Sequence, residues 1–68
     1  MSNAEIKNVD LTDANFASSN LYYTNFKNSN LTDTFFLETD LSYTNLKNVN
    51  LTRAKFKKAN LYLSLIHI

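Results

Sequence analysis

Few side chains in this sequence are able to do acid–base, nucleophilic or metal chemistry. His67 is the single histidine and there is no cysteine, so a Ser-His-Asp triad, a Cys nucleophile and a His or thiolate metal site find little support. Asp13 and Asp33 lie twenty residues apart, and paired carboxylates can share general acid–base work. Because Arg53 follows at the same spacing, a solvated charge ladder is the better interpretation. We expect no catalytic residue, cofactor or metal, and a protein that is not an enzyme.

These side chains must be positioned by one small and very regular domain. The chain has 68 residues, near the lower size at which a single core is stable without disulfides. It contains no glycine and no proline, the residues that usually supply tight turns. Its net charge is +1, from 7 Lys and Arg against 6 Asp and Glu, which predicts no strong attraction to nucleic acid or an anionic membrane.

The start of the chain indicates neither export nor membrane insertion. No basic segment followed by an apolar stretch is present, and no run approaches the ~18 apolar residues of a membrane span. The absence of cysteine agrees with a reducing compartment. We therefore expect a soluble cytoplasmic protein.

A repeat of five residues runs through the chain. Large apolar residues recur at this interval, and a small residue stands two positions before each. The apolar centres are Ile6, Leu11, Phe16, Leu21, Phe26, Leu31, Phe36, Leu41, Leu46, Leu51, Phe56, Leu61 and Ile66. Asn or Asp usually precedes the centre, with Glu5, Phe35, Lys55 and Leu65 as departures.

A period of five fits neither a helix nor a continuous strand. On a helix the centres would spiral around every face, and on a strand they would alternate between faces. The chain must therefore bend once per repeat. We expect the Asn and Asp residues to form these corners, since their side chains bond nearby backbone groups.

A second period of twenty residues predicts how many bends close one coil. Residues 9–28, 29–48 and 49–62 align with one another, so that Phe16, Phe36 and Phe56 share a register. Four repeats then form a coil, and like residues stack about 4.8 Å apart along the axis. The chain would form about three coils, with the centres pointing inward.

Tandem A-[D/N]-L-x-x repeats over essentially the whole chain resemble the pentapeptide-repeat family. The resemblance implies an all-β fold, a right-handed quadrilateral β-helix in which the centre and the small residue point inward. A leucine-rich repeat is the alternative, but it needs a longer frame in which Asn does not precede Leu.

Residues 63–68, Leu-Ser-Leu-Ile-His-Ile, break the twenty-residue alignment. They resemble the translation of a sequencing-library adapter, and the alternative is a natural apolar last strand. We thus interpret residues 1–62 as the solenoid and residues 63–68 as a non-native tail. The chain would then be a fragment of a longer protein, with continuation of the solenoid or end-to-end self-association at its ends.

Aromatic side chains are the best candidates for an interaction surface. Tyr22 and Tyr62 share one column, with Ser42 between them, and Tyr23 and Tyr43 share the next, which predicts an exposed aromatic side. Phe35, at a position where Asn or Asp is usual, is also expected to point outward, as a contact or a local distortion. The alternative is that these are ordinary surface residues of a β-sheet.

Other columns have simpler structural explanations. Thr12, Thr32 and Thr52 form a file that suits a β-ladder better than an ice-binding array. All acidic residues lie within residues 5–40, and every charged residue after them is basic. The predicted solenoid therefore has an acidic end and a basic end. Without a groove or a base-reading element, the basic end makes no strong case for nucleic acid.

The fold predicts a non-catalytic structural or protein-interaction module with an unidentified protein partner. The alternative, from the family resemblance, is a DNA-mimicking regulator of DNA gyrase or another DNA-binding protein, although such proteins are long, acidic and dimeric. A third hypothesis is a targeting module of a secreted bacterial effector, for which this sequence carries no mark.

Overall fold

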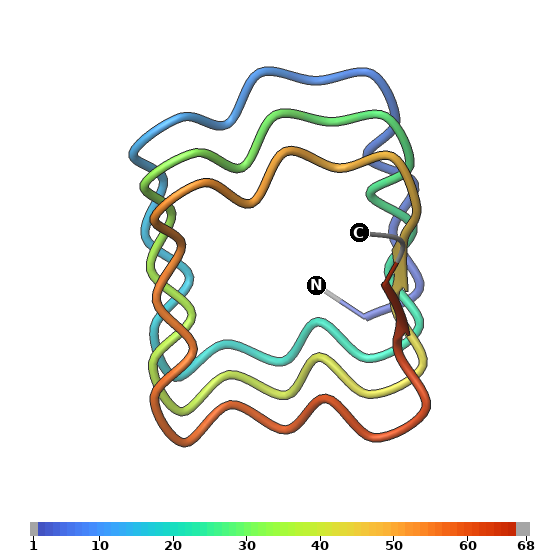
Figure 1. The fold of residues 1–68 in the computed structure, drawn as a ribbon. Coiled ribbons are helices and arrows are strands. Elements are labelled where there is room, and N and C mark those ends of the chain that lie inside the picture. Colours follow the sequence, from blue (N-terminus) through green and yellow to red (C-terminus); the bar gives the residue numbers. More distant parts are fainter. Residues whose placement is uncertain (1, 67–68) are drawn as a thin grey trace.

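The computed structural model describes residues 2–66, which form a right-handed β-helix with four sides. Viewed along its axis, the chain traces a near-rectangular outline, and each coil lies directly over the preceding one (Figure 1). Parallel bridges join residues twenty positions apart, such as Asn15 to Phe35 and Phe35 to Lys55. The predicted quadrilateral β-helix with four repeats per coil is therefore confirmed.

Regular strands are very short because the chain turns once per repeat. Residues 2–66 contain two strands, β1 (Asn45–Leu46) and β2 (Leu65–Ile66), which pair in parallel with Asn45 opposite Leu65. Elsewhere in residues 2–66 the coils are joined by isolated bridges. No helix in this part of the chain is long and apolar enough to cross a membrane.

Backbone hydrogen bonds run between coils on every side. On one side the Asn30 N–H donates to the Val9 carbonyl at 2.9 Å, and the Leu31 N–H donates to the Asn50 carbonyl at 2.8 Å. The middle coil is thus bonded to the coil on either side, as in a parallel sheet. This ladder holds the twenty-residue register.

The core consists of the repeat centres, as predicted. Leu21, Phe26, Leu31, Phe36, Leu41 and Leu46 are all buried. The rings of Phe16 and Phe36 stack with centroids 5.6 Å apart, and those of Phe36 and Phe56 stack at 5.1 Å. The three phenylalanines therefore form one internal column.

The small residues also point inward, and their hydroxyl groups are satisfied by backbone carbonyls. Thr39 donates to the Phe16 carbonyl of the preceding coil at 2.8 Å, and Ser29 donates to the Ile6 carbonyl at 2.6 Å. Within residues 2–66 no buried side-chain nitrogen or oxygen lacks a partner. A polar residue is tolerated here because its donor is paired inside the core.

The corners differ from the prediction. The residue with a left-handed backbone conformation is the second after each centre, for example Asp13 with φ of 67° and Asn28 with φ of 65°. The Asn or Asp before the centre lies in the bridge and caps the corner instead: Asp10 Oδ1 accepts the Thr12 N–H at 3.1 Å. The bond from the Ala14 N–H to the Leu11 carbonyl closes the turn, in the pattern of a type II turn.

This geometry explains how the chain bends without glycine. Asn and Asp enter the left-handed region more readily than other residues. Several corners nevertheless hold residues that do so at a cost, among them Tyr23, Tyr43 and Arg53. The ladders on both sides of each corner maintain these conformations.

Candidate interaction surface

Four tyrosines gather at one corner of the solenoid, which we call the aromatic corner (Tyr22, Tyr23, Tyr43 and Tyr62). The Tyr23 and Tyr43 rings stack with centroids 5.0 Å apart. Tyr22 contacts both of them edge-on, at 4.6 Å and 5.5 Å, and Tyr62 contacts Tyr43 edge-on at 5.9 Å. The structure therefore joins these residues in one continuous cluster that spans neighbouring coils.

The aromatic corner is only partly exposed. Tyr62 is 61% exposed and Tyr23 is 51% exposed, whereas Tyr22 and Tyr43 are half-buried because other rings of the cluster cover them. Ser42, at the surface position between Tyr22 and Tyr62, is buried. Of the aromatic side expected to be exposed, Tyr23 and Tyr62 are exposed, whereas Tyr22 and Tyr43 are half-buried beneath neighbouring rings.

The backbone holds these side chains in defined positions. Asn20 Oδ1 accepts the Tyr22 N–H and Asn60 Oδ1 accepts the Tyr62 N–H, both at 3.0 Å. Tyr23 and Tyr43 take the left-handed corner positions, each with φ of 60°. Two rings that stack from such fixed positions lose little conformational freedom when they bind a partner.

Burial and nearby groups raise the pKa of Tyr22 and keep its phenol neutral. Desolvation raises the pKa of Tyr22, and the neighbouring Tyr23, Tyr43 and Asp40 raise it further. Near neutral pH the corner therefore presents a phenol that can donate a hydrogen bond beside apolar ring surface.

Phe35 does not belong to this cluster. It lies on a different side of the solenoid, in the column of Asn15 and Lys55, and is 38% exposed. Lys55 Nζ lies 5.3 Å from the centroid of its ring, a cation–π contact. The ladder is regular here, since the Phe35 N–H donates to the Ala14 carbonyl at 2.9 Å, so Phe35 causes no break in pairing.

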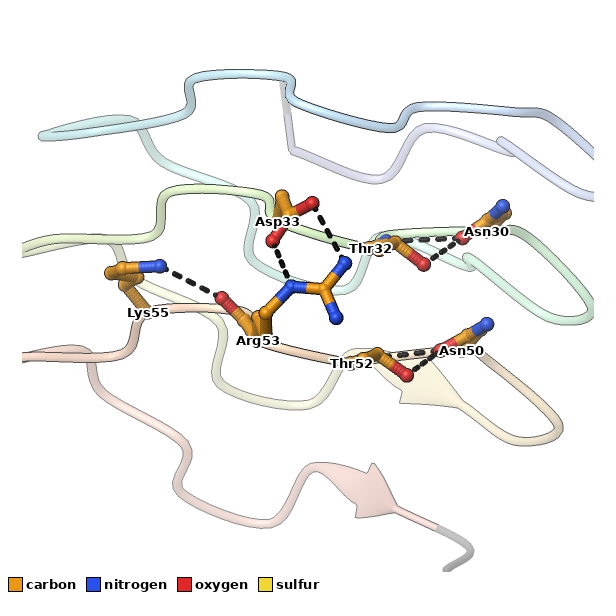
Figure 2. Close-up of polar contacts among 7 residues, drawn as sticks. All are labelled: Asn30, Thr32, Asp33, Asn50, Thr52, Arg53 and Lys55. Atoms are coloured by element: carbon orange, nitrogen blue, oxygen red, sulfur yellow. Dashed lines mark hydrogen bonds and ion pairs between the residues drawn. The ribbon is translucent and has the colours of Figure 1, made fainter.

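The column of Asp13, Asp33 and Arg53 is an ion-paired ladder. Arg53 Nε donates to Asp33 Oδ1 at 2.7 Å, and its terminal nitrogen donates to Asp33 Oδ2 at 3.1 Å (Figure 2). This bidentate contact lowers the pKa of Asp33, so the carboxyl group remains ionised at neutral pH. A pair of carboxylates that exchanges a proton between Asp13 and Asp33 finds no support in this arrangement.

The file of Thr12, Thr32 and Thr52 lies at the corner that also holds Asp33 and Arg53, and each hydroxyl group bonds the Asn or Asp that caps the turn. Thr32 Oγ1 donates to Asn30 Oδ1, and Thr52 Oγ1 donates to Asn50 Oδ1, both at 2.5 Å (Figure 2). Thr12 makes the same contact with Asp10 at 2.6 Å, and the pKa of Asp10 is lowered by the hydrogen bonds from Thr12. These threonines thus have a structural role.

Sites for other chemistry are sparse in residues 2–66. This part of the chain holds no group of three His, Cys, Asp or Glu side chains that could bind a metal ion. His67 lies outside the described residues. A shallow hollow of about 220 Å³ lies at another corner, lined by Leu37, Glu38, Lys57 and Lys58.

Sequence reasoning placed the tyrosines in the correct columns and missed this second corner. Phe35 was expected to point outward as a contact or a local distortion, and Lys55 was noted only as a departure from the Asn and Asp pattern. The available signal was that neither Phe35 nor Lys55 carries a side-chain acceptor oxygen, as Asn and Asp do. Its meaning was not evident from the sequence, because the structure first showed that this oxygen caps the turn.

Comparisons with known proteins agree with the geometry. A family model described as a pentapeptide repeat region matches residues 1–64. No match was found among curated proteins.

Two solved structures are similar to this chain. A pentapeptide repeat protein (Rfr23) from the cyanobacterium Cyanothece 51142 superposes with a TM-score of 0.94 over 98% of this chain and 46% of its own, at 22% identity. A pentapeptide repeat protein from the thylakoid lumen of Arabidopsis thaliana aligns at 23% identity over 87% of this chain and 51% of its own, with a TM-score of 0.37. The chain thus spans about half the length of each of these proteins. The similarity to the cyanobacterial protein shows a shared fold.

Proposed function

Because this chain belongs to the pentapeptide-repeat family, we propose that it is a non-catalytic protein-interaction module whose aromatic corner contacts a partner protein. The observation that carries the proposal is the joining of all 4 tyrosines of the sequence in one cluster at one corner. A scattered arrangement would instead favour ordinary surface residues.

Tyrosine suits this role for physical reasons. Its ring offers a large, rigid contact area, and its hydroxyl group can bond a polar group at the rim of an interface. Tyr23 and Tyr62 are the exposed members, and Tyr43 supports them from between. We expect Tyr23 and Tyr62 to provide most of the binding energy.

The proposal is tested by affinity capture with matched variants. A Tyr23→Asn/Tyr62→Ser double variant removes both exposed rings, and the control, Asn28→Ser/Thr52→Ser, changes the same kinds of corner position elsewhere. Proteins from a lysate of the source organism are captured on each and quantified by mass spectrometry. We expect a protein that is recovered on wild type and control and lost on the double variant. Equal recovery on all three, or no specific recovery on wild type, would contradict the proposal.

The alternative of a DNA-mimicking regulator has less support from the charges. Asp33 is paired with Arg53, and Lys55, Lys57 and Lys58 make the last coil basic. A mimic of DNA needs a continuous negative surface. Inhibition of DNA gyrase supercoiling by the pure protein would favour this alternative over the aromatic corner.

A further inference from the structure

A side-chain oxygen caps the first turn residue at most corners. The Asn or Asp in the bridge accepts the N–H of the residue two positions later, as Asn15 Oδ1 does with the Ala17 N–H at 2.9 Å. The same bond is made by Asp10, Asn20, Asn25, Asn30, Asp40, Asn45, Asn50 and Asn60. Since this N–H is not used in the ladder, the cap is its partner within the protein.

At one corner, two successive coils lack this cap. Phe35 and Lys55 stand where the capping residue should be, and neither side chain carries an acceptor oxygen. Within residues 2–66, the N–H groups of Leu37 and Lys57 therefore have no acceptor. The Leu37 N–H is in the middle coil, so its lack of a partner does not arise from the end of the solenoid.

The two uncapped N–H groups lie at neighbouring places. Phe35 and Lys55 are paired by a parallel bridge, so the turns that follow them are one coil apart, or about 4.8 Å. In the coil before, Asn15 caps Ala17 at the same corner, which shows the position that an acceptor oxygen would occupy. Two donors at this separation suit the two oxygens of one oxyanion.

The surrounding charges favour an anion. The exposed side chains of Lys57 and Lys58 line the hollow of about 220 Å³ at this corner, together with Leu37 and Glu38. Lys55 does not line this hollow, because its ammonium group donates to the Arg53 carbonyl at 3.0 Å and lies over the Phe35 ring. Glu38 is the single acid of the lining, and its charge favours one small oxyanion over an extended polyanion.

We propose that this corner, formed by the backbone N–H groups of Leu37 and Lys57 with the side chains of Lys57 and Lys58, binds a single oxyanion group, a carboxylate or a phosphate. The N–H groups fix the position of the anion, and the ammonium groups neutralise its charge. The site is separate from the aromatic corner and goes beyond the proposed function. Because it is open to solvent, we expect millimolar affinity that weakens with added salt.

The proposal is tested by following backbone amide resonances of ¹⁵N-labelled protein by NMR. Sodium phosphate and sodium acetate are titrated separately at constant ionic strength. We expect saturable shifts of the Leu37 and Lys57 amides, while the Ala17 amide, which Asn15 caps, serves as the internal control. A response to both salts supports a general oxyanion site, and a response to one alone assigns it to that class. No saturable response to either overturns the proposal.

A matched variant tests the mechanism. Phe35→Asn/Lys55→Asn supplies the missing caps and keeps Lys57 and Lys58, so affinity should fall about tenfold or more, because the N–H groups become occupied. Lys57→Gln/Lys58→Gln keeps the free N–H groups and should weaken binding through lost charge. The amide spectrum itself reports whether each variant is folded. Unchanged affinity in the first variant would refute the role of the backbone donors.

Discussion

Truncation of the middle phenylalanine tests the internal column most directly. Phe36 is 0% exposed, and its ring stacks between those of Phe16 and Phe56. In the Phe36→Ala variant, both stacked contacts are lost and a cavity forms inside the coil. The ladders around it hold the backbone in place, so the cavity cannot collapse fully.

The expected loss is large relative to the stability of the domain. A core Phe→Ala change costs about 3–5 kcal/mol, and two stacked neighbours place Phe36 near the top of this range, at about 5 kcal/mol. A chain of this size has a free energy of unfolding of roughly 3–10 kcal/mol. Phe56→Ala is the matched control: its ring is half-buried and stacks on one neighbour, so we expect a cost of about 2–3 kcal/mol.

Urea unfolding followed by far-ultraviolet circular dichroism measures both costs. The unfolding midpoint of the Phe56→Ala variant should fall clearly, and that of the Phe36→Ala variant should fall about twice as far or the protein should be unfolded without urea. Equal costs at the two positions would refute the argument, because burial and stacking on two sides would then carry no additional weight.

Three further predictions concern the corners. Asn45→Ala removes the oxygen that accepts the Lys47 N–H at 3.0 Å and should cost about 1 kcal/mol in urea unfolding, whereas Asn45→Asp, which keeps the acceptor, should cost less; equal costs would contradict the cap. The pKa of Asp33 is lowered in the folded protein by Arg53, so this stabilisation is complete above the ordinary value of 3.8 and is lost as the pH falls through the folded value. The difference in urea midpoint between wild type and Arg53→Ala should therefore shrink in acid, and a difference independent of pH would count against the pair. Tyr23→Asn should change the melting temperature little, because easier access to φ of 60° offsets the lost ring contacts, but Tyr23→Val should lower it strongly; similar melting temperatures would show that the corner is not strained.

The fold was predictable from the sequence because its two periods encode direction and register separately. The spacing of five selects which side chains point inward, and the spacing of twenty places Phe16, Phe36 and Phe56 in one column. The corner was assigned to the wrong residue for a related reason. Asp10 and Asp13 are both acceptable in a turn, and composition does not reveal which of them takes the positive φ.

The candidate surface was predictable only as far as its columns. The period placed Tyr22, Tyr23, Tyr43 and Tyr62 at one corner, but ring orientation depends on rotamers, which decide that Tyr22 and Tyr43 are covered. The uncapped corner after Phe35 could not be predicted, because it depends on which backbone N–H groups form no hydrogen bond between coils. The residue types alone do not determine this.

The uninterrupted twenty-residue register constrains how this molecule can lengthen. Duplication of twenty residues would add one coil to the solenoid and keep every column of side chains in register, including that of the tyrosines. Insertion of a single repeat after Tyr23 would rotate all later residues by a quarter turn. Tyr43 and Tyr62 would then move to the next corner, the Asp33–Arg53 pair would survive because both partners rotate together, and the cluster of rings would be divided. Growth by whole coils is therefore the route that preserves its surfaces.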